Sequence, residues 1–508
     1  MSSSHAERGK QRIFFNVVVG WGSYLIFIIS GFILPRLMDE YLGKELLGVW
    51  DFSWSIVNYI AISNVGLGAQ TSRFISEYVS LERKDLVAES ISTSFLLQLA
   101  VTAFVVGATL FISSNIDFVF KENLELIYTA KYTILFLGLS LAVQMLFDTS
   151  KGVLMGHHRW DINSGVNAGS RVLSMLLMII AMFNGHGLIG ISVAYFTGVT
   201  ISELVRLYFS FREVDAKIIV SKFNSRIAKK MFLYGVKGLT IALPQLILIQ
   251  TANILVGYSM GASSLAEFAR PLALIKFLQS FINRYSFVLT PIASAMTKQK
   301  DSTEIYDLVM SSARWGYSLT IPAIVFFVVS GDTLIRVWMG EDYVQSDLLL
   351  ILAVGHMLLI ANEPTLRVLM GLNRHGKYAI YNTILVLLSY AFLLVLTVNY
   401  EISLTTIATA LCIPLTIGYG IFQPIYTCKV LNIKIYDFFK SAFLLPVIIG
   451  AIFFIVLKVL NRNFMNDYAI IAADIFIGGV VILLLYWVFL LDKDAKQKIV
   501  KKITRQAG

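Results

Sequence analysis

Long runs of apolar residues constrain this chain more than any other feature. Most are about twenty residues long, the length that crosses a bilayer as a helix. Lipid offers no partner to open backbone groups, and the runs far exceed barrel strands, so all are predicted to be membrane-spanning helices. Fourteen runs can be marked, at about 13–35, 47–67, 90–113, 128–148, 166–184, 188–206, 232–257, 265–292, 315–330, 347–366, 378–398, 404–427, 441–460 and 469–491.

Composition supports the same class of protein. Hydrophobic residues make up 57% of the 508 residues and charged residues only 15%, whereas a soluble domain is about a quarter charged. The sequence therefore predicts an all-α polytopic membrane protein. Arg8, Lys10 and Arg12 precede the first run, but this run exceeds a signal core and lacks a small-residue cleavage site at its end. We expect it to be a permanent first span.

The distribution of basic residues predicts the orientation. With the N-terminus in the cytoplasm, about thirty Lys and Arg residues fall in cytoplasmic segments and only six in outer loops. This bias predicts fourteen spans with both termini cytoplasmic, in the inner or plasma membrane. It also explains the net charge of +10 better than nucleic-acid binding does. The six outer residues are Arg36, Lys44, Lys121, Lys131, Arg336 and Arg462.

Two short motifs occur twice. Residues 153–159 read VLMGHHR and residues 368–374 read VLMGLNR, and each motif follows the fourth span of a six-span unit. In a second echo, Gly43 and Gly261 stand at nearly the same separation as the two VLMG glycines. A chance match is the competing interpretation, since these residue types are common in apolar chains. We predict two six-helix lobes in a parallel pseudo-twofold repeat, followed by two additional C-terminal helices.

This repeat divides the chain into four predicted parts. The N-terminal six-helix lobe covers 1–210 and the C-terminal lobe 232–430. A basic cytoplasmic linker joins them at 211–231, for which a simple orientation-setting loop is an equally good interpretation. Two extra helices and a basic cytoplasmic tail make up 431–508.

Basic residues inside the spans are the candidate substrate-binding residues, because ionisable groups in a bilayer are costly and usually functional. Arg270, Lys276 and Arg284 share the eighth span with Glu267, which lies one turn from Arg270. Such a helix is expected to line a wet interior and attract an anion, most simply a lipid-borne pyrophosphate. Arg171 and Lys237 add positive charge, although snorkelling to the interface is the favoured interpretation of both, because each lies one or two turns from the cytoplasmic end of its span.

Carboxylates near the span ends are candidates for ion coupling or gating. Asp148 and Glu363 stand at matching places just before the two VLMG motifs. They suggest a cytoplasmic gate with Arg159 and Arg374. Ordinary interfacial charge is the competing interpretation for each. The other carboxylates in this group are Asp51, Glu203 and Glu267.

A family resemblance rests on the region after the second span. Residues 66–73 read GLGAQTSR, followed by Glu77, Tyr78 and the charged turn 82–85. This pattern, with the VLMG loop, resembles the polysaccharide transporter family of the multidrug/oligosaccharidyl-lipid/polysaccharide exporter superfamily, which includes O-antigen and repeat-unit flippases. The resemblance implies alternating-access translocation of a polyprenyl-diphosphate oligosaccharide, alongside a polymerase and glycosyltransferases. The carboxylates are candidates for coupling H⁺ or Na⁺ to that movement, and the sequence does not choose between the two ions. Twelve spans are common in that family, so the extra pair leaves the subfamily open.

Three alternative functions fit parts of the sequence. A lipid II-type flippase is favoured by fourteen spans. A cation-coupled multidrug exporter is disfavoured by the basic eighth span, and a membrane polymerase or glycosyltransferase by the short loops. We expect neither an enzyme nor a bound cofactor, because the chain lacks a phosphate-binding loop. His157 and His158 have no evident metal-ligand partners, and Cys412 and Cys428 are expected to be packing residues.

Overall fold

The computed structural model describes residues 2–64, 66–118, 123–213, 222–299, 302–399, 402–460 and 466–491, with 493, 496–497 and 500–501. Within these ranges the regular structure is helical, with no strand. The chain divides into two compact units, Met1–Ala266 (unit 1) and Glu267–Gly508 (unit 2). The division falls inside one helix, and the predicted linker 211–231 lies partly outside the described residues.

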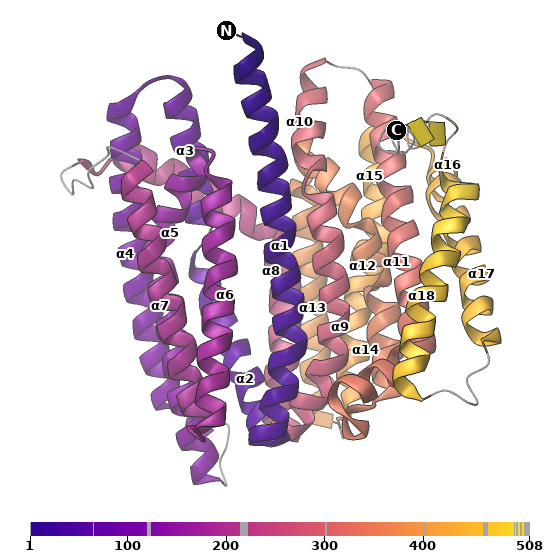
Figure 1. The fold of residues 1–508 in the computed structure, drawn as a ribbon, viewed down its shortest axis with the longest axis horizontal. Helices are drawn as coiled ribbons and strands as arrows, with labels where there is room; N and C mark the ends of the chain where they lie inside the picture. The colour runs from indigo at the N-terminus through magenta and orange to yellow at the C-terminus, as the bar shows by residue number, and fades with distance from the viewer. Residues whose placement is uncertain are drawn as a thin grey trace. The chain divides into compact units, whose positions relative to one another are not determined.

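Unit 1 is built around helix α5, which packs against α2, α3, α4 and α7, while α6 packs against α7 and α1 (Figure 1). A 3-10 turn, η1 (Ala61–Asn64), extends α2 toward the break before α3. The helices are α1 (Ser2–Leu42), α2 (Lys44–Ile60), α3 (Leu67–Ser80), α4 (Lys84–Ser114), α5 (Leu124–Gly156), α6 (Trp160–Phe183), α7 (Gly187–Glu213) and α8 (Ser225–Met260).

Unit 2 is built around α12, which packs against α10, α11 and α14. Its first helix, α9 (Ala262–Ser286), begins in unit 1. The others are α10 (Leu289–Gln299), α11 (Ser302–Met339), α12 (Ser346–Gly371), α13 (Gly376–Asn399), α14 (Leu404–Leu415), α15 (Gln423–Leu431), α16 (Ile435–Phe439), α17 (Leu445–Val459) and α18 (Asp467–Leu485). Three π-helical segments continue them: η5 (Thr416–Phe422), η6 (Lys440–Leu444) and η7 (Tyr486–Leu490).

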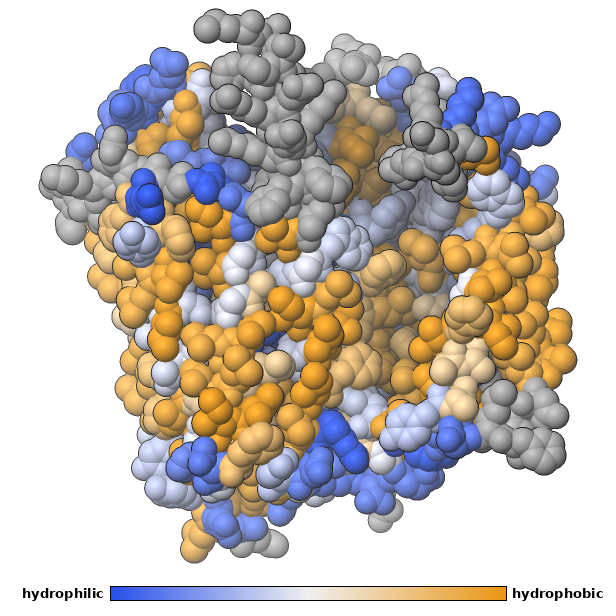
Figure 2. Space-filling view, in the orientation of Figure 1, coloured by the Kyte–Doolittle hydropathy of each residue, from blue (hydrophilic) through white to orange (hydrophobic). Residues whose placement is uncertain are grey.

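The predicted all-helical, multi-pass class is confirmed. Each of the fourteen apolar runs overlaps a helix, and ten helices in the described part of the chain are long and apolar enough to cross a membrane. Large apolar side chains such as Phe111 (71% exposed) and Phe476 (75% exposed) face outward. Figure 2 shows hydrophobic residues over the middle of the helices and hydrophilic residues near their ends. Outward apolar surface of this extent fits lipid rather than water.

Polar N-cap side chains begin several of the long helices. Asn123 Oδ1 accepts hydrogen bonds from the backbone N–H groups of Glu125 and Leu126, each at 3.1 Å. Asn224, Ser403 and Asn466 do the same for α8, α14 and α18. These bonds satisfy donors that have no partner within the helix, which fixes where each helix starts.

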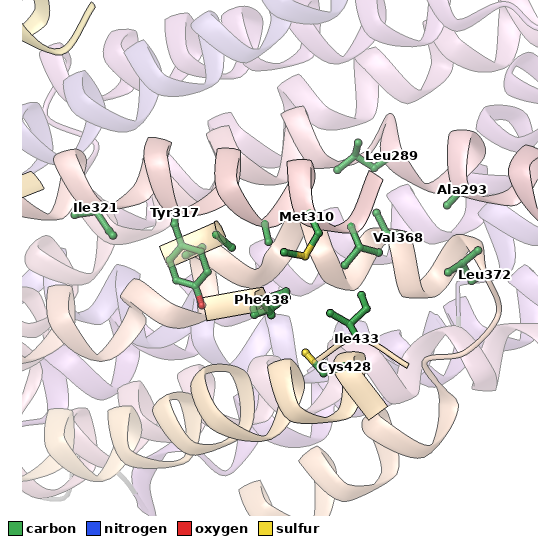
Figure 3. Packing of buried hydrophobic residues seen from close by; sticks show 14 residues of the cluster. Leu289, Ala293, Met310, Tyr317, Ile321, Val368, Leu372, Cys428, Ile433 and Phe438 are labelled. Atoms are coloured by element: carbon green, nitrogen blue, oxygen red, sulfur yellow. The ribbon is translucent and has the colours of Figure 1, made fainter. Parts of the chain in front are cut away.

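A buried hydrophobic cluster holds α10, α11 and α12 of unit 2 together with α15 and α16 (Figure 3). Tyr317 of α11 is fully buried in it, and Phe438 and Cys428 belong to the same cluster. Cys412 is also buried, and neither cysteine forms a disulfide. Both cysteines thus have the packing positions that the sequence predicted.

The two C-terminal helices are attached to α11 by polar and close apolar contacts. Ser330 Oγ donates to the buried Asp474 Oδ2 of α18 at 2.5 Å, and the Tyr486 hydroxyl donates to the Ser318 carbonyl. Gly450 of α17 lies where an added Cβ would overlap the Ile321 side chain of α11. The absence of a side chain at Gly450 therefore lets α17 approach α11 closely.

Candidate functional site

Helix α9 carries the predicted substrate-binding residues of unit 2. Arg270 is buried at 3% exposure, Lys276 is half-buried and Arg284 is exposed. At about 100° per residue, Arg270 and Arg284 lie about 40° apart around the helix axis, on one face. Glu267 Oε2 accepts a hydrogen bond from Gln345 Nε2 at 3.0 Å, which ties the start of unit 2 to the segment before α12.

A buried histidine that the sequence analysis missed lies close to Lys276. His356 of α12 is 1% exposed, and its Nδ1 lies 2.8 Å from the Leu352 carbonyl oxygen. The Lys276 charge interacts electrostatically with the His356 ring, while Cys412 Sγ lies 3.9 Å from Nδ1. The sequence signal was a single histidine in the middle of an apolar run, which marks an intramembrane ionisable group.

The carboxylate of Glu363 forms an ion pair within α12. Arg367 Nε donates to Glu363 Oε1 at 2.8 Å, and Arg367 Nη2 lies 3.5 Å from Asn283 Oδ1 of α9. Thr290 of α10 donates to the Arg367 carbonyl at 3.1 Å. Glu363 is 8% exposed, so this pair sits in a largely water-excluded place next to the α9–α10 break.

An amide network lies beside this ion pair. Asn362 is fully buried, and its Nδ2 lies 2.9 Å from the Tyr317 hydroxyl and 2.9 Å from the Tyr419 carbonyl. Gln423 Nε2 donates to the Asn362 carbonyl at 2.9 Å. These bonds join α12 to α11, η5 and α15, and buried bonds of this kind restrict the rotation of α12.

Asp148 has several partners in unit 1. Gln98 Nε2 donates to Asp148 Oδ2 at 3.2 Å, and Asn64 Nδ2 lies 3.5 Å from the same oxygen. Lys151 Nζ lies 3.6 Å from Asp148 Oδ1. Gly68 of α3 leaves room for the carboxylate, because a Cβ there would overlap Oδ2. Asp148 is 8% exposed, as Glu363 is in unit 2.

Glu203 lies near Asp148. Arg206 Nη1 lies 3.2 Å from Glu203 Oε1 within α7, and Arg206 Nη2 donates to Asn167 Oδ1 of α6 at 2.6 Å. The charges of Asp148 and Lys151 also act on Glu203. The structure therefore brings two of the predicted carboxylates together in unit 1, each with its own cation on the same helix.

The other predicted residues lie elsewhere. Arg159 pairs with Asp161 at 3.2 Å, and Arg374 Nη1 donates to the Val430 carbonyl at 2.8 Å. The cations that pair with Asp148 and Glu363, the two carboxylates predicted to form a gate, are instead Lys151 and Arg367. Arg171 lies over the Phe27 ring, 4.6 Å from its centroid. Asp51 is half-buried on α2, and the side chain of Lys237 lies outside the described residues.

The two VLMG loops have the same local geometry. Gly156 of α5 packs on α3, where an added Cβ would stand 2.7 Å from Ile75 Cβ and 3.1 Å from the Ser72 carbonyl. Gly371 of α12 packs on α10 in the same way, where an added Cβ would stand 2.7 Å from Ala293 Cβ and overlap the Thr290 carbonyl. In each helix the carbonyl comes from the residue one turn before the contacted Cβ. Gly43 (φ 84°, ψ 167°) and Gly261 (φ 87°, ψ 171°), the second pair of matching glycines, also have nearly the same backbone dihedral angles.

These features define a class of protein: a multi-pass, all-helical membrane protein. Solved structures show the same fold. A multidrug resistance MATE family transporter of the MOP superfamily, inward-facing, aligns with a TM-score of 0.68 at 16% identity, covering 84% of this chain and 99% of that chain. The lipid II flippase MurJ, inward closed, aligns with a TM-score of 0.66 at 16% identity, covering 94% of this chain and 98% of that chain.

Family membership follows from the sequence. The family model described as "Polysaccharide biosynthesis protein" matches residues 76–347, more than half of the chain, and the chain belongs to this family. The predicted resemblance is thereby confirmed. A relative from Bacillus subtilis (strain 168), the uncharacterized membrane protein EpsK, is 22% identical over 435 residues, covering 82% of this chain and 83% of the relative.

Proposed function

We propose that this protein is a flippase that moves a polyprenyl-diphosphate-linked oligosaccharide across the cytoplasmic membrane, for cell-surface polysaccharide synthesis. The observation that carries the proposal is the set of basic residues Arg270, Lys276 and Arg284 on α9 of a chain in the polysaccharide biosynthesis family. Arg binds phosphate oxygens through a planar pair of donors and Lys binds them as a point charge. A diphosphate head group is the ligand that best matches these side chains. Arg171 and Lys237 are proposed as secondary contacts.

The proposed mechanism is alternating access between two lobes. Fourteen spans with both termini cytoplasmic, and a parallel repeat of residues 1–210 and 232–430 joined at 211–231, make up the proposed architecture, with 431–508 as an added helix pair. The matching packing of Gly156 and Gly371 supports the repeat. A polymerase and glycosyltransferases are the proposed partners, because a flippase of this kind receives its lipid-linked substrate from glycosyltransferases and delivers it to a polymerase.

The carboxylates of unit 1 are the proposed ion-coupling groups. Asp148 and Glu203 act on each other electrostatically and each has a cation on its own helix. H⁺ or Na⁺ entering this site would shift the balance of these pairs, and the ion pair of Glu363 with Arg367 offers a comparable element in unit 2. Asp51, Glu267, Arg159 and Arg374 are proposed to act with them at the gates.

A lipid II-type peptidoglycan precursor flippase is the second candidate. It is supported by the extra helix pair and by the 94% of this chain that aligns with the lipid II flippase structure. Both candidates use a diphosphate lipid, so only the sugar distinguishes them. A cation-coupled multidrug exporter is less well supported, because the charges on α9 are mainly basic and cations would be repelled.

The test is transport by purified protein in proteoliposomes. Arg270→Gln and Lys276→Gln are expected to abolish translocation of a defined polyprenyl-diphosphate oligosaccharide, while protein remains folded in the membrane. Lys458→Gln is the matched control, because it removes a lysine charge from a helix other than α9. Lys458 Nζ lies over the Phe454 ring, 5.9 Å from its centroid, and its helix, α17, packs against α11 and α18. Full transport by both α9 variants would reject the assignment of the phosphate contact. Parallel assays with lipid II and with a cationic drug decide between the candidates.

A further inference from the structure

Three aromatic rings meet in unit 1, and they belong neither to the ion pairs described above nor to the basic helix α9. Trp50 and Trp54 lie on α2 and Tyr195 on α7. The Trp54 and Tyr195 ring centroids lie 5.3 Å apart, the two Trp rings 6.0 Å apart, and Trp50 and Tyr195 6.3 Å apart. We call these three residues the aromatic corner.

The rings of the aromatic corner are close to mutually perpendicular. Their interplanar angles are 77°, 84° and 87°, so each pair meets edge to face. A ring that meets its neighbours in this way keeps a further face for another partner. All three residues are half-buried rather than part of the fully buried core. The aromatic corner is thus ordered by its own contacts and still presents apolar ring surface.

A basic side chain acts on the aromatic corner. Arg171 of α6 interacts electrostatically with Tyr195, and its guanidinium lies over the Phe27 ring of α1. Flat apolar faces beside a phenol and a guanidinium match a ligand that has both apolar faces and hydroxyl groups.

We propose that the aromatic corner, with Arg171, is a contact site for a pyranose unit of the transported saccharide. The C–H face of the sugar ring packs on Trp54, and its hydroxyl groups bond to Tyr195 and Arg171. An interfacial aromatic belt explains single Trp residues at helix ends. It does not explain the convergence of two helices on three perpendicular rings beside an arginine. The inference rests on the proposed function, because it places the sugar of that substrate.

Binding of two lipids that differ only in their sugar tests this site. The full-length protein in detergent is titrated with a polyprenyl-diphosphate oligosaccharide and with the same polyprenyl diphosphate lacking sugar. Trp54→Leu is expected to weaken binding of the oligosaccharide lipid about tenfold, the effect of losing about 1.4 kcal/mol, with affinity for the bare lipid unchanged. Trp54→Phe keeps a stacking face and is expected to recover most of the loss. Trp487→Leu on the C-terminal helices, where Trp487 is 37% exposed, is the matched control.

The outcomes separate the site from the function. If Trp54→Leu weakens both lipids equally, or neither, or if Trp487→Leu has the same selective effect, the saccharide site is wrong while the flippase proposal stands. If the wild type binds neither lipid, the proposed function fails and the saccharide site fails with it. Thermal unfolding of each variant is measured alongside, and Trp54→Phe supplies the folded comparison should Trp54→Leu be unstable.

Discussion

His158 and Asn373 occupy the same position in the two VLMG loops, and both adopt the left-handed backbone conformation, with φ of 60° and 54°. In each loop the N–H of the following arginine donates to the carbonyl of the motif leucine, at 2.8 and 3.0 Å. Both helices therefore end in the same hydrogen-bonded turn. A sequence motif shared by two parts of the chain is accompanied here by a shared backbone conformation.

These two positions should tolerate glycine and reject β-branched residues. His158→Val and Asn373→Val are expected to lower the free energy of unfolding by about 1–2 kcal/mol each, because an L-residue with a branched Cβ is strained in this conformation. His158→Gly and Asn373→Gly are the controls and should lose nothing from this cause. Thermal unfolding in detergent measures the difference. Equal melting temperatures for the Val and Gly variants would contradict the prediction.

Close helix approach at the two VLMG glycines gives a second prediction. Gly156→Ala and Gly371→Ala place a Cβ within 2.7 Å of a neighbouring helix, so each is expected to cost about 1–3 kcal/mol of stability. Gly169→Ala on α6 meets nothing within 4 Å and is expected to be neutral or to stabilise by up to about 1 kcal/mol. If all three variants unfold at the same temperature, the packing described at these glycines is incorrect.

The Glu363–Arg367 pair should be energetically coupled. Its side chains are 10% and 25% exposed, so solvent screens the pair only in part. A double-mutant cycle with Glu363→Gln and Arg367→Gln is expected to give a coupling energy of about 1–3 kcal/mol in unfolding experiments. The Arg83–Asp85 pair, with both side chains 56% exposed, is the control and should show a much smaller coupling. Equal coupling energies in the two cycles would show that burial does not strengthen the Glu363–Arg367 pair.

Acidification should weaken the loop between α12 and α13. Burial lowers the pKa of His375 below its ordinary value of 6.5, so the unfolded chain binds a proton more readily than the folded chain. The stability that neutral His375 contributes is present above its ordinary pKa and is lost as the pH falls toward the lowered value. His375→Gln should flatten the decline of the melting temperature between about pH 7 and pH 5. An unchanged pH profile in this variant would assign the decline to other groups.

Much of the fold was predictable because it depends on local sequence. Apolar runs of span length must form helices in lipid, and all fourteen overlap helices of the structure. Family membership was equally readable from residues 66–85 and the VLMG loops. The breaks within helices were less so: residues 265–292 were predicted as one segment, whereas α9 ends at Ser286 and α10 begins at Leu289.

For the candidate site, the sequence could predict which residues take part but not which of them are in contact. From the sequence, Asp148, Glu203 and Glu363 were predicted to be ion-coupling or gating carboxylates. Arg159 and Arg374 were predicted to be the gate partners of Asp148 and Glu363. The structure gives Asp148 the cation Lys151 and Glu363 the cation Arg367, each within its own helix. It also shows that the charge of Lys276 on α9 acts on the ring of His356 on α12, a relationship between two helices that no sequence motif indicated.

The sequence by itself determined that the chain is helical, membrane-spanning and a member of the polysaccharide biosynthesis family, because span length and residue type act locally. Only the tertiary structure decided which polar and aromatic groups meet. Trp54 and Tyr195 belong to helices α2 and α7, far apart in the sequence, yet their ring centroids lie 5.3 Å apart. Such a contact depends on how two helices rotate and pack against each other, and that rotation is set by the sum of many distant contacts rather than by either helix alone.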